Sequence, residues 1–464
     1  MGRRHTTPDH QQILAWFRKA AERGDAYAQF NLGLLYRKGE FVERDDRTAF
    51  DWMLRAARKG LAYAQNHVGS MYCSGQGVAQ CDVEAARWFR RAAEQGDPSA
   101  QQNLGQLYRQ GRGVPACAEQ AFCWFYRAAE QGVPSAQALV GECYLSGTGA
   151  PHNHALAMAW LRKAAVQGDA SAQMNLGRMY AEGQGVDRSD IMALGWLRQA
   201  AAQDHPVAQR LLGRAYAEGR GVRADPLRAL GWLERAAGQG DCEAQFDLAL
   251  LVSSGRAAPA DDARALALFT RAAEAGHVSA QYNLGSMYGN GRGTGRDMQR
   301  ALAWYRRAAE QGAPNAQFNL GVMYATGQGV DKDEACAARW YRIAADQGDA
   351  SAQNNLGVMY ANGQGVHRSD ILAAFWYARA AEQGHALAQY NLAGMYHAGR
   401  GVRRDPAVAY MWMLLAAQAG DAGAAAGREL AEQRLDPGQL ARGRDLAERW
   451  QVLRTPATRA GASL

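Results

Sequence analysis

The chain has 464 residues, a formal net charge of +7 and a hydrophobic content of 48%. Apolar runs stay well short of the roughly 18 residues of a membrane-spanning helix, so we expect no membrane insertion. The positive charge is mild for this length, and the chain shows neither a basic patch interleaved with aromatic residues nor a known nucleic-acid-binding module. We therefore expect no nucleic-acid partner.

The N-terminal residues predict a short tail followed by one helix. Residues 1–8 are expected to be a disordered tail, and Asp9 to Arg23 predicts a helix, so that residues 9–24 form a half-repeat cap. An apolar stretch does not follow the two N-terminal arginines, and the sequence therefore predicts a cytoplasmic protein without a signal peptide. A start site further upstream would instead make the protein periplasmic or secreted.

The middle of the chain repeats with a fixed period, which predicts eleven units over residues 25–420. The glutamine of an Ala-Gln pair recurs every 36 residues without an insertion, at Gln29, Gln65, Gln101, Gln137, Gln173, Gln209, Gln245, Gln281, Gln317, Gln353 and Gln389. Self-similarity at such a period is typical of a solenoid, in which each unit covers the apolar face of its neighbour.

The unit over residues 349–384 shows why each repeat is predicted to be a helix hairpin. Apolar residues recur at helical spacing in its first half, from Ala352 to Tyr360, and again in its second half, from Ala373 to Ala381. Gly363 and Gly365 lie between the halves, where a turn requires positive φ. Ser369 or Asp370 is expected to cap the second helix, and Gly384 to close it.

A tryptophan stripe and an alanine pair mark the second helix of each unit. Eleven of the twelve tryptophans share one repeat position, from Trp16 to Trp412, and their fixed frame predicts core packing rather than a ligand site. Small residues such as Ala380 and Gly357 recur where helices are expected to approach closely.

One unit departs from the pattern. It has Ala249, Val252, Ala257 and Leu268 where most other units have Gly, Tyr, Gly and Trp. Two interpretations remain open: drift in a tolerant array, or a weak joint over residues 245–276. Hydrogen exchange separates them, because protection equal to that of the flanking units would exclude a joint.

The pattern fades after Gly420. Residues 421–434 and a helix that starts at Asp436-Pro437 predict C-terminal capping helices over residues 421–454. Residues 455–464 are expected to be a disordered tail.

The stretch AQFNLGVMYATGQGVDKDEACAARWYRIAADQG at 316–348 resembles the Sel-1-like repeat family, relatives of the tetratricopeptide repeats. The resemblance covers residues 9–450. It implies an all-α, right-handed α/α superhelical solenoid of 36-residue hairpins, with first helices on the concave side. It also implies a scaffold or adaptor that holds other proteins, and bacterial members are linked to signalling, envelope biogenesis and host interaction.

A search for catalytic or metal-binding motifs favours a non-enzyme without cofactors. The Gly-x-Gly turns recur in nearly every unit and lack the features of a phosphate-binding loop. His152 and His154 lack further metal ligands in the sequence. The cysteines are odd in number and scattered, which is typical of free thiols in a reducing compartment: Cys73, Cys81, Cys117, Cys123, Cys143, Cys242 and Cys336.

The family's geometry places the concave groove at positions one, five and eight after each repeated glutamine. These positions predict a basic part, with Arg178, Arg210 and Arg214, and an apolar-aromatic part, with Tyr282, Phe318, Val322, Val358 and Tyr390. A groove with two such parts suits an extended peptide with an acidic and a hydrophobic end. The alternative is that the aromatic residues are partly buried against adjacent helices and the arginines are solvated.

The sequence therefore predicts a non-catalytic scaffold or adaptor that binds a protein or extended peptide, in bacterial signalling or complex assembly. One alternative is an exported envelope or host-interaction factor of the same fold. Another is an enzyme or small-molecule binder built on the solenoid, which a nucleophile or metal cluster in the groove would support.

Overall fold

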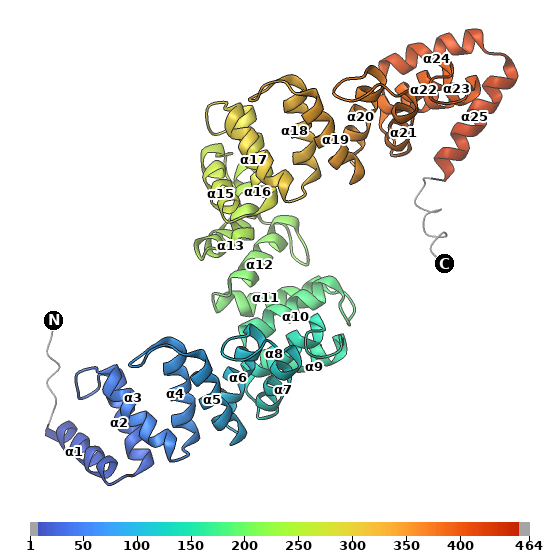
Figure 1. The fold of residues 1–464 in the computed structure, drawn as a ribbon. Coiled ribbons are helices and arrows are strands. Elements are labelled where there is room, and N and C mark those ends of the chain that lie inside the picture. Colours follow the sequence, from blue (N-terminus) through green and yellow to red (C-terminus); the bar gives the residue numbers. More distant parts are fainter. Residues whose placement is uncertain (1–7, 454–464) are drawn as a thin grey trace. The chain divides into compact units, whose positions relative to one another are not determined.

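The structure is a computed structural model that describes residues 8–453, and it divides into two compact units, Met1–Ala236 and Ala237–Leu464. Every regular element among the described residues is an α-helix, which confirms the predicted all-α class (Figure 1). Consecutive helices form antiparallel hairpins that repeat along each unit. The predicted tails, residues 1–8 and 455–464, lie outside the described residues, except that Pro8 begins the first helix.

In the first unit, one helix precedes six hairpins, and the division between the units falls within the last helix. The helices are α1 (Pro8–Glu22), α2 (Ala26–Lys38), α3 (Asp46–Arg58), α4 (Ala62–Ser74), α5 (Asp82–Glu94), α6 (Pro98–Gln110), α7 (Ala118–Glu130), α8 (Pro134–Ser146), α9 (His154–Val166), α10 (Ala170–Glu182), α11 (Asp190–Ala202), α12 (Pro206–Glu218) and α13 (Pro226–Gly238).

The second unit contains five further hairpins and two C-terminal helices, the last of which packs back on α23. The helices are α14 (Cys242–Ser253), α15 (Asp262–Glu274), α16 (Val278–Asn290), α17 (Met298–Glu310), α18 (Pro314–Thr326), α19 (Glu334–Asp346), α20 (Ala350–Asn362), α21 (Asp370–Glu382), α22 (Ala386–Ala398), α23 (Pro406–Gln418), α24 (Ala422–Arg434) and α25 (Pro437–Val452).

Capping residues delimit the helices of each hairpin. At α20 the side chain of Asp349 accepts a hydrogen bond from the backbone N–H of Ala352 at 2.6 Å, and Gly363 ends the helix with φ of 72°. At α21 the hydroxyl of Ser369, rather than Asp370, accepts from the backbone N–H of Leu372. Each cap satisfies a backbone group that a helix end leaves without an intrahelical partner.

Within a hairpin, one glycine allows the two helices to approach closely. A Cβ added at Gly357 of α20 would lie 2.7 Å from Cδ1 of Tyr377 on α21. Such a distance is well inside van der Waals contact, so a Cβ at position 357 would displace the aromatic ring that packs on the glycine. The same contact joins Gly105 to Phe125 and Gly285 to Tyr305.

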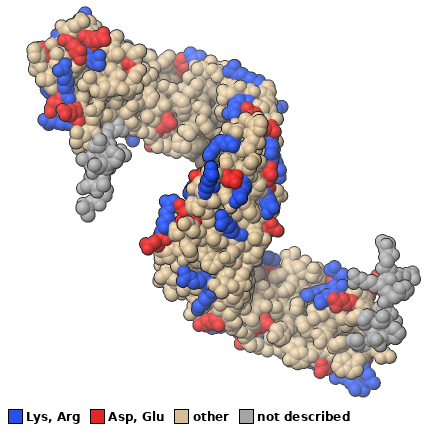
Figure 2. All heavy atoms as spheres, turned by 180° about the vertical axis from the view of Figure 1, so that it is seen from behind, with Lys and Arg blue, Asp and Glu red and all other residues tan. Residues whose placement is uncertain are grey.

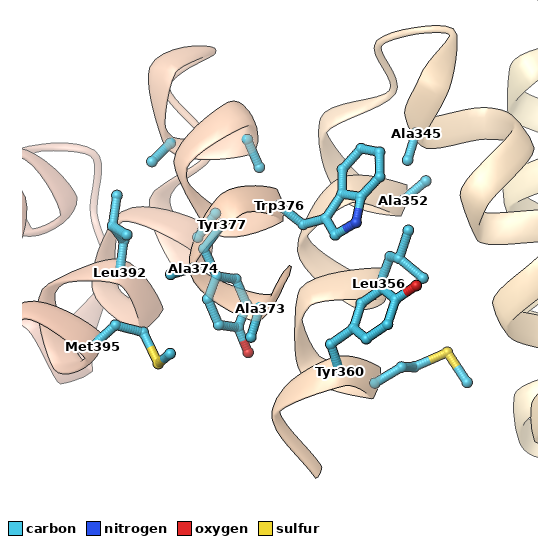
Figure 3. Close-up of a cluster of buried hydrophobic side chains, with 14 of the residues drawn as sticks. Ala345, Ala352, Leu356, Tyr360, Ala373, Ala374, Trp376, Tyr377, Leu392 and Met395 are labelled. Carbon is cyan, nitrogen blue, oxygen red and sulfur yellow. The ribbon is translucent and has the colours of Figure 1, made fainter. Parts of the chain in front are cut away.

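Tryptophans fill the space between successive hairpins. Figure 3 shows the indole of Trp376 pointing from α21 toward Ala345, Ala352 and Leu356 of the preceding helices, and Trp376 is buried. The predicted core role is wrong for Trp16, which is 66% exposed. Trp52 of α3 packs on the cluster of Ala21, Ala28 and Leu32 from the two helices before it, α1 and α2. The described residues place no helix before α1 to receive Trp16.

The repeated glutamine joins each hairpin to the one before it. Its side-chain NH₂ donates to a backbone carbonyl eight residues earlier, as Gln353 does to Ala345 at 2.9 Å. In seven repeats its oxygen in turn accepts a hydrogen bond from a glutamine thirty residues later, as from Gln383 at 2.8 Å. The carbonyl of Ala345 also accepts a hydrogen bond from the backbone N–H of Gly348 at 3.0 Å, so the buried amide provides this carbonyl with a second donor.

The irregular repeat differs from the others at its turn. Helix α14 ends one residue early, at Ser253, although Gly255 is left-handed with φ of 68° like the glycines that end the other first helices. At Gly77 and Gly401, the equivalents of Ala257, an added Cβ would lie 2.0 Å from a backbone oxygen. The turn that contains Ala257 therefore follows a different path, while the weak joint over residues 245–276 stays a prediction.

Candidate functional site

The candidate site is a pocket in the first unit beside two of the predicted groove arginines. Arg178 projects from α10 and Arg214 from α12, so one hairpin repeat separates them. Between these two helices the pocket has a volume of about 190 Å³, with α11 behind it. We call it the α10–α12 pocket; its lining residues are Arg178, Ala181, Glu182, Asp190, Ala193, Leu194, Leu197, Leu211, Arg214, Ala215 and Arg220.

The floor of the α10–α12 pocket is apolar. Leu194 and Leu197 of α11 are only 3% and 4% exposed, and Leu211 of α12 is half-buried beside them. In six other repeats the equivalent of Leu197 is aromatic: Phe89, Phe125, Phe269, Tyr305, Tyr341 and Tyr377. Leucine, which the two neighbouring repeats also have at Leu161 and Leu233, fills less space than a phenyl ring.

An ion pair that three other repeats form is absent at the rim of the pocket. In three repeats an arginine of the Gly-Arg-Gly turn reaches back to the aspartate thirty residues earlier, as Arg292 does to Asp262 at 2.7 Å. Asp190 and Arg220 have the same spacing, yet Arg220 pairs with Glu218, and Asp190 lies 3.5 Å from Arg188 instead. The competing carboxylate of Glu218 thus keeps Arg220 from closing over Asp190.

Hydrogen bonds hold Arg178 at the rim. Its guanidinium donates to Oδ1 of the buried Asn175 at 3.3 Å, and the NH₂ of Asn175 donates to Glu142 at 3.2 Å. Burial raises the pKa of the Glu142 carboxyl, while the nearby guanidinium of Arg109 and the hydrogen bond from Asn175 act in the opposite direction. The charge of Arg178 also lowers the pKa of Glu142, so Arg178 interacts with this carboxylate as well as with the amide of Asn175.

The third predicted arginine lies outside the pocket lining. Arg210 is on α12, one turn before Arg214, and is half-buried. The structure thus brings two of the three predicted basic residues, Arg178 and Arg214, to one pocket.

The predicted apolar-aromatic residues occupy successive first helices of the second unit. Tyr282, Phe318, Val322 and Val358 are partly buried and pack against the hydrophobic clusters beneath them, whereas Tyr390 is 37% exposed. The ring of Tyr282 lies 5.7 Å from that of Tyr305, and Phe318 lies 5.8 Å from Tyr341. Each of these side chains therefore leaves only part of its surface exposed to solvent.

Sequence reasoning missed the floor and the rim acid of the pocket. Leu194, Leu197 and Leu211 fall at frame positions that look like ordinary core, and Glu218 falls next to a turn. The signal was present in the comparison of repeats. A Gly-Arg-Gly turn whose arginine follows an aspartate by thirty residues occurs four times, and only this copy carries an acid two residues before the arginine.

The described residues contain no group of three or more His, Cys, Asp or Glu side chains placed to hold a metal ion. His152 and His154 lie against each other with ring centroids 4.3 Å apart. Across residues 8–453, no helix combines the length and apolarity that crossing a bilayer requires. On the face drawn in Figure 2, Lys and Arg are interspersed with Asp and Glu.

Comparisons with known proteins identify the repeat. The family model described as “Sel1 repeat” matches twelve consecutive segments: residues 2–25, 26–61, 62–97, 98–133, 134–169, 170–205, 206–241, 242–277, 278–312, 314–349, 350–385 and 386–421. Among curated proteins, none matches the chain.

Two solved structures are similar over most of their own length. One is c5321, described as a protective antigen of uropathogenic Escherichia coli with an SLR fold. It is 35% identical, covers 96% of each chain and has a TM-score of 0.78. The other is a Sel1 repeat protein from Oxalobacter formigenes, 33% identical with a TM-score of 0.51, which covers 70% of this chain and 97% of its own.

Proposed function

Because the chain belongs to the Sel1 repeat family, we propose that it is a non-catalytic scaffold or adaptor that binds a protein or an extended peptide along its first helices. The observation that carries the proposal is the α10–α12 pocket, where two of the predicted groove arginines flank an apolar floor. Repeat solenoids present extended surfaces of this kind, and a peptide binds them by placing side chains in successive pockets.

The second unit supports the same function with a different chemistry. Tyr282, Phe318, Val322, Val358 and Tyr390 leave part of their apolar surface accessible on successive first helices. Partly exposed aromatic residues are frequent anchors in protein interfaces. We assign the acidic portion of a partner to the first unit and the apolar portion to the second, in the assembly of a bacterial signalling or other complex in the cytoplasm.

The test is selection from a displayed library of random twelve-residue peptides on the intact protein. We expect the selected peptides to share acidic and apolar residues. Their binding should weaken at least about tenfold in the double variant Arg178→Glu with Arg214→Glu, since each charge pair becomes repulsive. The matched control reverses Arg47 and Arg223, two exposed arginines outside the pocket. A library that yields no binders refutes the proposal.

A second candidate is an exported envelope or host-interaction factor of the same fold. The similarity to c5321, which is described as a protective antigen, favours it. Fractionation of cells that naturally produce the chain separates the two candidates, since an envelope or secreted location supports the second and a cytoplasmic location the first.

A further inference from the structure

Helix α22 is capped at its N-terminus by a histidine, where six other helices at the same repeat position are capped by an aspartate. We propose that His385 is an acid-sensitive cap, so that acidification from about pH 7.5 to about pH 5 loosens the hairpin of α22 and α23 while the aspartate-capped hairpins stay closed. This conformational response goes beyond the proposed function and does not depend on it.

The helices at this repeat position fall into three groups by the residue that precedes them. Six have an aspartate whose side chain accepts a hydrogen bond from the backbone N–H three residues later: Asp25, Asp97, Asp169, Asp241, Asp349 and Asp421. Three have a histidine whose Nδ1 atom is the acceptor: His205, His277 and His385. Three have Leu61, Val133 or Ala313 and form their hairpins without a side-chain cap. Loss of a cap should therefore loosen a hairpin locally rather than unfold the chain.

His385 can cap α22 only while its imidazole is neutral. Its Nδ1 atom accepts from the backbone N–H of Ala388 at 3.2 Å, so the neutral ring carries its proton on Nε2. Protonation of Nδ1 removes this acceptor and places a positive charge at the positive end of the helix dipole. Histidine changes charge between pH 5 and 8, whereas an aspartate stays ionised down to about pH 4.

The surroundings of His385 favour the neutral ring. The side chain is half-buried, and burial lowers the pKa of His385, while the carboxylate of Asp349 acts in the opposite direction. That carboxylate is itself engaged as the cap of α20. Helix α23 has no charged side chain, and the other charged groups at the neighbouring helix ends are Arg379 and Glu382 on α21 and Asp421 before α24. Because the pKa is lowered, the cap contributes fully above about pH 6.5 and is lost as the pH falls through the lowered value.

The other two histidine caps should respond less. Nε2 of His277 lies 3.2 Å from Oε1 of Glu243, so a charged imidazole at α16 keeps an ion pair that offsets the lost hydrogen bond. At α12 the Nδ1 atom of His205 lies 3.4 Å from the backbone nitrogen of Ala208, which makes a longer and weaker bond than at α22. The acid response should therefore be largest at α22.

Native-state hydrogen exchange of the full chain at about pH 7.5 and about pH 5 tests the proposal. We expect the protection of the α22 amides, corrected for the intrinsic exchange rate at each pH, to fall about fivefold on acidification, which is the typical effect of an N-cap. The α20 amides are the internal control, because Asp349 caps that helix, and they should keep their protection.

Two variants identify the cause. His385→Asp introduces the cap that six other helices have and should abolish the acid-induced fall. His385→Ala removes the cap at both pH values and should give lower protection that does not change with pH. His397, in the last turn of α22, is common to all three proteins, so the comparison cancels its titration. Unchanged α22 protection in the wild type, or an equal fall in His385→Asp, overturns the proposal.

Discussion

Completing one missing hydrogen bond between repeats should stabilise the C-terminal part of the array. The side-chain oxygen of Gln389 is buried without a hydrogen-bond partner among the described residues, because Ala419 stands where seven repeats have the donating glutamine. The backbone at Ala419 (φ −79°, ψ 2°) matches that at Gln383 (φ −81°, ψ −5°), which does donate to Gln353. The substitution Ala419→Gln therefore places a donor within reach.

The expected gain is about 1 kcal/mol. An unsatisfied buried acceptor costs about 1–3 kcal/mol, which a new hydrogen bond would remove. Ordering the glutamine side chain opposes this gain, because it costs up to about 2 kcal/mol in rotamer entropy. Ala419 is exposed, so the longer side chain meets no core packing. A gain of this size corresponds to roughly a fivefold change in a local opening equilibrium.

Native-state hydrogen exchange of the α22 amides is the suitable measurement, because repeat arrays open locally rather than as one cooperative unit. We expect protection to rise about fivefold in Ala419→Gln. The same substitution in a Gln389→Ala background should bring no gain, since the acceptor is gone. An equal gain in both backgrounds, or none in either, would show that the assigned hydrogen bond is not the cause.

Three further predictions concern packing, pH and the pocket rim. Gly357→Ala should destabilise the chain by about 1–3 kcal/mol, because the Cβ of the alanine would meet the ring of Tyr377. Gly394→Ala is the control and should not destabilise the chain, since the space around its Cβ is open. Thermal denaturation of the two variants compares them. Burial and the nearby Arg37 lower the pKa of His67 to about 4. The neutral imidazole of His67 should therefore contribute fully to the free energy of unfolding above pH 6.5, and this contribution should be lost as the pH falls to 4. Urea titrations at several pH values should show a weaker pH dependence of the free energy of unfolding in His67→Asn. Glu218→Asn, which copies the Asn290 of the repeat with a formed Arg292–Asp262 pair, should let Arg220 pair with Asp190 and narrow the pocket in a crystal structure; an unchanged Arg220 contradicts the competition argument.

The helix hairpins follow from the sequence because their determinants are local and repeated. Caps such as Asp349, turn glycines such as Gly363 and the spacing from Ala352 to Tyr360 all lie within one unit, and their recurrence removes ambiguity about where helices begin and end. The role of the repeated glutamine was not predicted, although its recurrence was. A polar residue in every repeat carries no indication of its acceptor, which lies in the preceding hairpin and becomes apparent only when the hairpins are stacked.

The exposed Trp16 shows the limit of reasoning from a repeat position. Trp376 is covered by the two helices before it, α19 and α20, whereas the described residues place no helix before α1. The same residue at the same frame position is therefore buried in Trp376 and exposed in Trp16. Burial is therefore a property of the neighbouring repeat as much as of the residue. A periodic pattern predicts a core correctly only where the neighbour on the covering side is also present.

The same reasoning explains why two groove arginines could be predicted and the pocket beside them could not. Arg178 and Arg214 were found because their frame positions point to one face of the first helices. The pocket depends instead on which of two acids pairs with Arg220. Glu218 is two residues away and Asp190 thirty, and both spacings are visible in the sequence, but only the structure shows that Arg220 pairs with Glu218. The repeats of this chain share one architecture, so shared residues do not distinguish one surface from another. The Asp–Arg pair does, because three repeats form it and the fourth does not. The specificity of this protein is therefore best sought at such departures from its own pattern.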